Sequence, residues 1–336
     1  MDSWPVPFAS ILAAKARIDD RDTPEEIRER MKYIRARVGN RPFGVDLVLP
    51  RGMPARDDRA EIERQLPDEH RAFVDQLYEK YQVPKSDKPG WRSRFVRSDQ
   101  MAQEQIQAVL ESDVNMFACG IGAPPGAIEQ AKADGKKVLA LVGSPHHAQT
   151  ALASGAEILV AQGYDAGAHT GTIGSFTLIP QIVDIAGDVP VLAAGGVATG
   201  RHIAAAYALG AQGVWLGTVW LGTQEHALSE ILVKKLLAAG SQDAVISRAD
   251  SGKTLRQIRS AWSEEWAAPD APKPLKMPYQ DILIGDLLGA IDDHEIEPLM
   301  HYPAGQGIAY VNELRTVDQV MTELVGDAES ALRRIG

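Results

Sequence analysis

Residues 189–218 read VPVLAAGGVATGRHIAAAYALGAQGVWLGT, and this stretch decides the fold. It holds two short apolar runs, and each run ends in a turn that contains glycine, Gly195-Gly196 in the first and Gly217-Thr218 in the second. A helical pattern separates the two runs. Continuously apolar runs are typical of strands buried on both faces of a parallel sheet, and parallel neighbours need a crossover connection. The stretch therefore predicts a β-α-β unit.

The same alternation continues upstream of this stretch. Apolar runs that we expect to be strands lie at 42–50, 115–122, 137–143, 157–164, 189–196 and 213–218, with a weaker one at 8–14. Helical patterns lie at 24–38, 124–134, 145–154, 176–186 and 199–209. Alternating strands and helices predict an α/β fold with a parallel sheet. Because eight such strands close a TIM barrel, we expect a TIM (β/α)8-type barrel that is shortened at its N-terminus.

Two polar stretches interrupt the alternation. The first has helical spacing at 60–81 and 100–110, and the second contains Trp262, Trp266 and a proline-rich linker. We interpret both as helical decoration that forms a lid and a cap. The expected division is 1–50 for the first barrel units, 51–112 for the helical lid, 113–240 for the barrel half that carries the site, 241–300 for the C-terminal helical cap and 301–336 for a closing segment.

Composition and charge exclude several classes of protein. Hydrophobic residues make up 45% and charged residues 24% of the chain, which is ordinary for a globular domain. The net charge of −10 argues against nucleic acid as a partner, and no apolar run is long enough to span a membrane. The single cysteine, Cys119, excludes an internal disulfide. The first residues lack the basic region of a secretory signal, so we expect a cytoplasmic protein.

Glycine is concentrated where the predicted strands end, and the carboxyl ends of parallel strands carry the sites of barrels and open sheets. Two consecutive turns, Gly195-Gly196 and Gly217-Thr218, follow the last two predicted strands. Backbone N–H groups in such turns suit a phosphate group. A phosphate site at these turns is therefore expected.

A third glycine-rich loop, AQGYDAGAHTG at 161–171, adds polar side chains. The Gln162 amide offers both a donor and an acceptor, so it can pair with the edge of a heterocycle. The His169 imidazole can remove a proton from a substrate carbon. The alternative is that His169 only forms hydrogen bonds within its own loop.

These two motifs, in this order, resemble the flavin-dependent nitronate monooxygenase family. The resemblance extends to ISRADSGKTLRQIRSAWSEEW at 246–266 and to HYPAGQGIAYVNEL at 301–314. It implies a TIM barrel that binds FMN non-covalently beneath a helical cap. By this resemblance, residues 113–240 form the half of the barrel that binds FMN.

The resemblance also implies roles for single residues. His169 matches the catalytic histidine of the family, and Asp46 falls where relatives often have an asparagine near the flavin. The other positions that fall where the family binds FMN are Gln162, Gly167, Gly195, Gly196, Leu216, Gly217 and Thr218. This chain departs from the family pattern at Ala168, where glycine is usual, and at Trp215, where glutamine or methionine is usual. It also lacks the Pro-Met strand and the glycine-rich segment with which relatives begin.

The other histidines have no comparable setting. His146 and His147 begin a predicted helix, and adjacent residues on a helix point in different directions, so they form no metal pair. His202 and His226 are expected on helices behind the barrel, whereas His70, His294 and His301 have no supporting constellation. No zinc, P-loop or nucleophile-elbow spacing occurs. We therefore expect no metal site.

Three functions remain open at this point. The first is an FMN-dependent oxidoreductase of the nitronate monooxygenase type, which oxidises an alkyl nitronate or a similar stabilised carbanion with O2. The second is an NAD(P)H-dependent FMN reductase of quinones or enoyl thioesters. The third is a binding protein built on a barrel without a cofactor. The expected partners are a small-molecule substrate, O2 and, for the reductase, NAD(P)H, and a homodimer is a candidate assembly.

Overall fold

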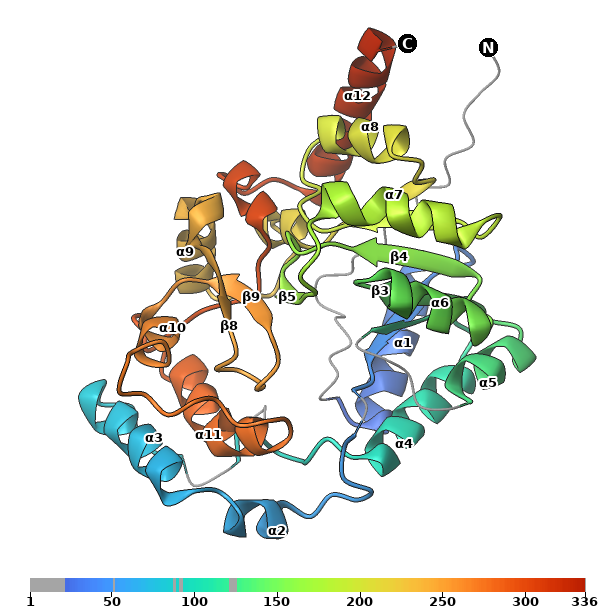
Figure 1. The fold of residues 1–336 in the computed structure, drawn as a ribbon. Coiled ribbons are helices and arrows are strands. Elements are labelled where there is room, and N and C mark those ends of the chain that lie inside the picture. Colours follow the sequence, from blue (N-terminus) through green and yellow to red (C-terminus); the bar gives the residue numbers. More distant parts are fainter. Residues whose placement is uncertain (1–21, 51, 87–88, 91–92, 121–125, 336) are drawn as a thin grey trace.

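The computed structural model describes residues 22–50, 52–86, 89–90, 93–120 and 126–335. Its centre is a six-stranded parallel sheet, and in Figure 1 the arrow of β4 runs across the view with its head toward β5. The sheet is curled as a half-barrel. In order across the sheet, its strands are β1 (Gly44–Val48), β2 (Met116–Gly120), β3 (Lys137–Val142), β4 (Ile158–Gln162), β6 (Val191–Ala194) and β7 (Gly213–Trp215).

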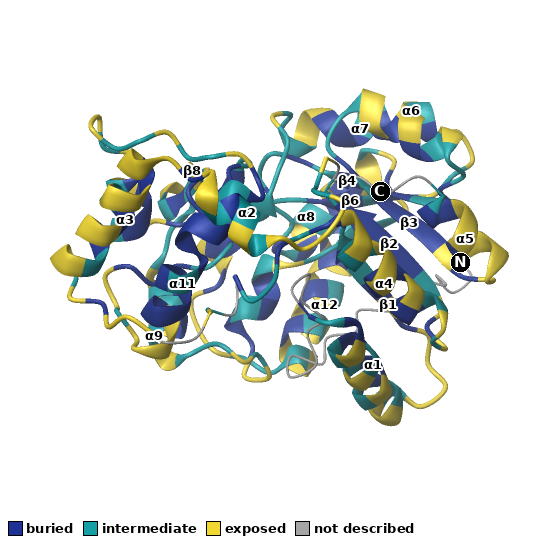
Figure 2. Ribbon diagram, turned by 90° about the horizontal axis from the view of Figure 1, so that it is seen from below, coloured by how far each residue is buried: buried dark blue, intermediate teal, exposed yellow. Residues whose placement is uncertain are grey.

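The strands are apolar without alternation because both of their faces are buried. In β4, Leu159 and Ala161 belong to the large core cluster that the outer helices share, whereas Val160 packs with Ala118 and Leu139 of the neighbouring strands. Figure 2 shows helices of the outer layer lying against the sheet with their buried sides turned inward. The outer helices are α1 (Pro24–Val38), α4 (Asp99–Leu110), α5 (Ala127–Ala133), α6 (Pro145–Ala153), α7 (Ser175–Ala186) and α8 (Gly200–Ala208).

The α/β fold with a parallel sheet is confirmed, and two expected elements differ in extent. The run at 213–218 is a strand only to Trp215, because a 3-10 helix, η1 (Thr218–Gly222), begins directly after Gly217. The helical pattern at 60–81 is interrupted before Pro67 and gives α2 (Arg59–Arg64) and α3 (Asp68–Lys80). The weak strand expected at 8–14 lies outside the described residues.

A second body of helices lies beside the sheet (Figure 1). Its core is α11, whose Ile284 and Leu287 are fully buried together with Leu77 and Trp262. A small antiparallel sheet, in the order β5-β9-β8, connects the site loop to this body. The remaining elements are β5 (Ala168–His169), α9 (Glu230–Ala238), η2 (Ser241–Asp243), β8 (Ala244–Ser247), β9 (Leu255–Ile258), α10 (Ala261–Glu265), α11 (Tyr279–Asp293), η3 (Gln306–Tyr310) and α12 (Val317–Ile335).

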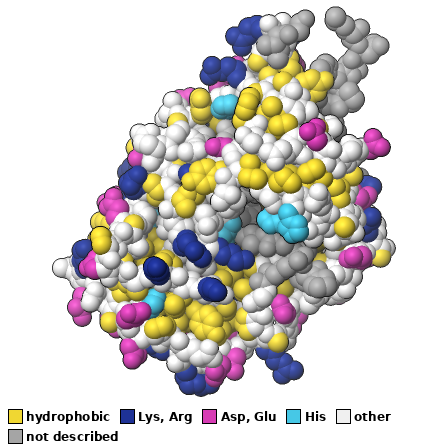
Figure 3. Space-filling view, in the orientation of Figure 1, with side chains coloured by type: hydrophobic (Ala, Val, Ile, Leu, Met, Phe, Trp, Pro, Cys, Tyr) yellow, Lys and Arg dark blue, Asp and Glu magenta, His cyan; other side chains and the backbone are white. Residues whose placement is uncertain are grey.

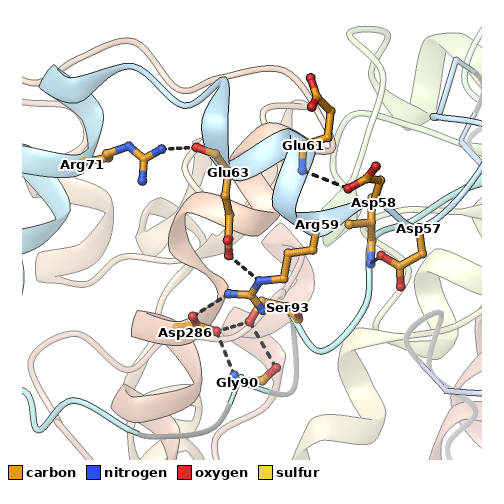
Figure 4. Close-up of polar contacts among 10 residues, drawn as sticks. Asp57, Asp58, Arg59, Glu61, Glu63, Arg71, Gly90, Ser93 and Asp286 are labelled. Carbon is orange, nitrogen blue, oxygen red and sulfur yellow. Dashed lines mark hydrogen bonds and ion pairs between the residues drawn. The ribbon is translucent and has the colours of Figure 1, made fainter.

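A polar network joins the two polar stretches of the sequence into this one body, as Figure 4 shows. The Arg59 guanidinium of α2 lies 2.7 Å from the Asp286 carboxylate of α11 and 2.5 Å from Glu63. It also donates to the carbonyl of Ser93 at 2.7 Å. Asp286 in turn accepts the backbone N–H of Gly90 at 3.0 Å.

Among the described helices, none is long and apolar enough to cross a membrane.

Candidate active site

The carboxyl ends of β4, β6 and β7 lie side by side in the sheet and open into a pocket of about 250 Å³. Six residues singled out from the sequence line it: Gln162, Gly167, Gly195, Gly196, Gly217 and Thr218. The remaining lining residues are Ala166, Ala168, Ala194, Val197, Trp215, Leu221, Pro303 and Gly307. The glycine-rich loops of the sequence are therefore brought together at one edge of the sheet.

The first glycine turn has a backbone that other residues rarely adopt. Gly195 has φ +91° and Gly196 has φ +75°, both in the left-handed region. A Cβ on Gly195 would also lie 2.9 Å from the carbonyl oxygen of Gly163. Within the described part of the chain, neither backbone N–H donates a hydrogen bond. The turn therefore offers two backbone donors at the pocket.

The second glycine turn is open toward the pocket. A Cβ built on Gly217 would meet no atom within 4 Å. Thr218 begins η1, and its hydroxyl oxygen accepts the backbone N–H of Gly305 at 2.9 Å. The backbone N–H groups of Gly217 and Thr218 donate no hydrogen bond to any described residue. The four residues that carry these backbone donors line one pocket, and such donors in strand-to-helix loops can bind phosphate.

The third loop places Gln162 and His169 together. The Gln162 side chain donates its amide N–H to the carbonyl of His169 at 2.7 Å, and its Oε1 makes no hydrogen bond within the described residues. His169 lies in β5, opposite Leu255 of β9. Ala168, where the family has glycine, is left-handed with φ +59°, so the chain keeps the glycine conformation with a Cβ present.

His169 is neutral at neutral pH because of its surroundings. Its Nε2 lies 2.8 Å from the hydroxyl oxygen of Ser251. Burial, and to a smaller extent the charges of Arg97 and Lys253, lower the pKa of His169 to about 4, against the opposing effect of Asp281 and Asp250. Figure 3 shows a hollow in this face of the molecule, with histidine, lysine and arginine side chains around it. The histidine is therefore uncharged at neutral pH, and both cations and carboxylates lie near it.

Three of the residues singled out from the sequence do not line the pocket. His169 adjoins it through Ala168, which does line it. Leu216 packs in a hydrophobic cluster, and its carbonyl accepts the Trp220 indole N–H at 2.9 Å. Asp46 lies in β1, at the other edge of the described sheet from β7. Burial raises the pKa of the Cys119 thiol to about 12, and the nearby Asp46 adds to this effect.

Sequence reasoning missed several groups and misplaced one. His301 was expected to have no constellation, but it is buried against Asp250 and Trp262. His226 lies in the loop between η1 and α9 rather than on a helix. Ser251 and Pro303 reach the site from the two segments that extend the family resemblance, which is the signal that could have found them. In the described residues, no group of three His, Cys, Asp or Glu could hold a metal ion.

Comparisons with known proteins identify the family of this chain. The model of the family described as "Nitronate monooxygenase" matches residues 19–327. A Mycobacterium tuberculosis protein named "Putative monooxygenase Rv1533" is 36% identical over 319 residues, which are 90% of this chain and 84% of that protein. A Staphylococcus aureus protein named "Probable nitronate monooxygenase" is 31% identical over 222 residues, 63% of this chain and 62% of that protein.

A solved structure of another protein shares the fold. The structure of nitroalkane oxidase from Streptomyces ansochromogenes superimposes with a TM-score of 0.79, covering 96% of this chain and 92% of that chain at 24% sequence identity. At this identity the match shows the fold alone. The family match and the curated relatives show the family: this chain belongs to the nitronate monooxygenase family of flavin-dependent oxidoreductases.

Proposed function

We propose that this chain binds FMN at the described pocket and oxidises alkyl nitronates, or similar stabilised carbanions, with O2. The observation that carries the proposal concerns four residues that line one pocket, Gly195, Gly196, Gly217 and Thr218: their backbone N–H groups have no partner in the described residues. The family supplies the cofactor class. The full fold in this proposal is a TIM (β/α)8 barrel, of which the described sheet is six strands.

The residues present fit FMN. Gly217 leaves open space where a Cβ would otherwise stand, so a phosphate can approach its backbone closely. Oε1 of Gln162 remains available as an acceptor for a ring N–H of the flavin. A pocket of about 250 Å³ suits the phosphate end of the cofactor. When bound, the isoalloxazine supplies the redox chemistry, and the protein supplies binding, orientation and electrostatics.

The charges around His169 favour an anionic substrate. Arg97 and Lys253 are close enough to His169 to lower its pKa, so the same charges stabilise a nitronate held beside the ring. The neutral ring can either accept a proton from a nitroalkane or donate a hydrogen bond to the anion. In both roles His169 is the residue that contacts the substrate in this proposal.

The experiment is an absorbance spectrum of the purified protein followed by anaerobic titration. We expect a flavin spectrum, or its appearance on addition of FMN, and bleaching of the flavin by ethyl nitronate. Reoxidation by O2 should then complete one turnover. A colourless protein that takes up no FMN would favour the binding protein without a cofactor.

A second titration, with NADH and NADPH, tests the reductase alternative. In the proposed function neither nucleotide bleaches the flavin within seconds under anaerobic conditions. Rapid bleaching by either nucleotide, without bleaching by the nitronate, would replace the monooxygenase by an NAD(P)H-dependent reductase of quinones or enoyl thioesters.

A further inference from the structure

Ser251 is buried beside His169 in the turn between β8 and β9. Ser251 is only 3% exposed, and its hydroxyl oxygen lies 2.8 Å from Nε2 of His169. The other contact of this oxygen is the backbone N–H of Lys253 at 3.4 Å. A backbone N–H is a donor, so it cannot receive the hydroxyl proton.

The hydroxyl proton therefore has one destination among the described residues, Nε2 of His169. A buried hydroxyl without an acceptor would cost the folded protein roughly 1–3 kcal/mol of stability. The Ser251 hydroxyl therefore donates its hydrogen to the ring of His169. A neutral imidazole that accepts at Nε2 carries its hydrogen on Nδ1. The ring is neutral at pH 7, since its pKa is lowered to about 4 chiefly by burial. Nδ1 itself makes no hydrogen bond to the described residues.

The turn that carries Ser251 is held in place by its neighbour Asp250. The Asp250 carboxylate accepts the Trp262 indole N–H at 2.9 Å and lies 3.0 Å from Nε2 of His301. The His301 ring is stacked on Trp262, with 3° between the planes. All three residues are buried. Asp250 and Ser251 are adjacent, so this cluster fixes the direction from which the hydroxyl reaches His169.

Both ring nitrogens of His301 have a partner in this cluster. Nδ1 lies 2.9 Å from the carbonyl oxygen of Leu299, and Nε2 lies 3.0 Å from the Asp250 carboxylate. The ring of His301 is therefore held in one orientation beside Asp250.

The charged groups that face His169 come from three segments. Lys253 and Asp250 belong to the turn that carries Ser251, Arg97 lies directly before α4, and Asp281 lies in α11. Arg97 and Asp281 lie 3.8 Å apart, with side chains 11% and 4% exposed. Arg97 and Lys253 disfavour a proton on the ring, and they favour an anion beside it.

We propose that Ser251 is a positioning residue that fixes His169 as the Nδ1–H tautomer, so that His169 donates a hydrogen bond to an anionic oxygen of the substrate instead of removing a proton from carbon. The inference rests on the proposed function and assigns His169 one of its two roles. No proton is transferred in this contact. The substrate must then arrive as a preformed anion, and the ring keeps its hydrogen throughout.

The tautomer can be measured without any activity. Protein labelled with ¹⁵N in its histidine rings gives two-bond correlations whose pattern differs between the Nδ1–H and Nε2–H forms, and His169→Gln identifies the His169 signals. We expect the Nδ1–H pattern at pH 7, with and without FMN. Ser251→Ala should shift the signals toward a mixture, whereas Ser154→Ala, at the half-buried C-cap residue of α6, should leave them unchanged. An Nε2–H pattern in the wild type would overturn the proposal.

Kinetics with one substrate in two protonation states test the consequence. Freshly dissolved neutral nitroethane should give almost no initial rate, and the rate should rise only as ethyl nitronate forms in solution. His169→Gln keeps an N–H donor and should retain more activity on the nitronate than His169→Ala. Ser251→Ala should lower kcat/KM for the nitronate by about tenfold, the scale of one hydrogen bond.

Two results separate the possible failures. Immediate turnover of neutral nitroethane that His169→Ala abolishes, with turnover of the nitronate preserved, would make His169 a general base and refute this inference while the proposed function stands. If neither form is oxidised, the proposed function fails, and the tautomer pattern alone then decides the role of Ser251.

Discussion

Thr218 is joined to Gly305 across the pocket by a hydrogen bond of 2.9 Å, from the backbone N–H of Gly305 to the threonine hydroxyl oxygen. Gly305 is itself held against the third loop, because a Cβ there would lie 2.6 Å from the carbonyl oxygen of Asp165. The loop after β4, the turn after β7 and the segment after α11 are thereby fixed to one another. The proposed phosphate site is part of this connection.

Replacement of Thr218 by valine tests that connection. Valine has a methyl group in place of the hydroxyl, so Gly305 loses its acceptor and a ligand loses a possible hydrogen-bond partner. The free energy of unfolding should fall by about 1 kcal/mol. The dissociation constant for FMN, measured by quenching of flavin fluorescence, should rise at least tenfold. Thr218→Ser keeps the hydroxyl and should restore both values. An unchanged dissociation constant in the valine variant would place the phosphate elsewhere.

Gly217 gives the cleaner test of the phosphate position. Its φ is −123° and its Cβ position is open, so Gly217→Val should fold and melt like the wild type. The added side chain fills the space proposed for the phosphate, so the purified variant should contain no flavin. Gly196→Val is less informative, because φ is +75° and a Cβ would lie 3.0 Å from that of Asp165.

Gly326→Ala is the control for Gly217→Val, since its Cβ position in α12 is also open and Gly326 does not line the pocket. It should leave flavin content unchanged. Flavin retention by Gly217→Val at the wild-type level would exclude the second glycine turn as the phosphate site.

The sequence predicted the parts of the site that are local in the chain. A strand followed by Gly195-Gly196 carries its own signal, because apolar runs and glycine turns are read from neighbouring residues. Ser251 and His301 carry no such signal. Their partners, His169 and Asp250, lie far away along the chain, so only the folded arrangement of the small antiparallel sheet brings them together.

The departure from the family pattern at Ala168 predicts that a substitution by glycine stabilises the protein. Left-handed backbone disfavours a residue with a Cβ by about 1–2 kcal/mol, and glycine loses roughly 0.5–1 kcal/mol through its greater freedom in the unfolded chain. With φ +59° at this position, Ala168→Gly should therefore raise the free energy of unfolding, by up to about 1 kcal/mol in urea titrations. Ala205→Gly, at an exposed position inside α8, should lower it by about 1 kcal/mol. A loss of unfolding free energy in both variants would contradict the left-handed conformation of Ala168.

The network around Arg59 should contribute to the stability of the helical body. Arg59→Met breaks contacts with Glu63, Asp286 and the carbonyl of Ser93, and it leaves Asp286 half-buried without its cation. We expect a loss of about 1–3 kcal/mol in the free energy of unfolding. Arg64→Met, in the same helix, removes an exposed pair with Glu61 and should change stability by less than about 1 kcal/mol. Similar losses for both variants would show that the network contributes no more than a surface ion pair.

The pKa of His169 predicts how stability depends on pH. A histidine has a pKa near 6.5 in the unfolded chain, whereas burial lowers the pKa of His169 to about 4 in the folded protein. Between these values the unfolded state binds a proton that the folded state does not, so stability is complete above about pH 6.5 and falls as the pH drops toward 4. Glu26 acts at lower pH, because its hydrogen bond with Arg94 and its contacts with Thr23 outweigh burial and hold its pKa at about 2.

The His169→Gln variant isolates the contribution of this histidine. We expect the free energy of unfolding, measured with urea between pH 5 and pH 7, to fall less steeply with acid in the variant than in the wild type. The two slopes should differ by up to about 1.4 kcal/mol per pH unit, which corresponds to one bound proton. Below about pH 4 the two slopes should converge, because both states of the wild type are then protonated and Glu26 contributes equally to each protein. Parallel slopes from pH 7 to pH 5 would mean that His169 titrates normally. In that case the ring would be partly charged near pH 6, and the neutral donor that Ser251 fixes would not persist in the site.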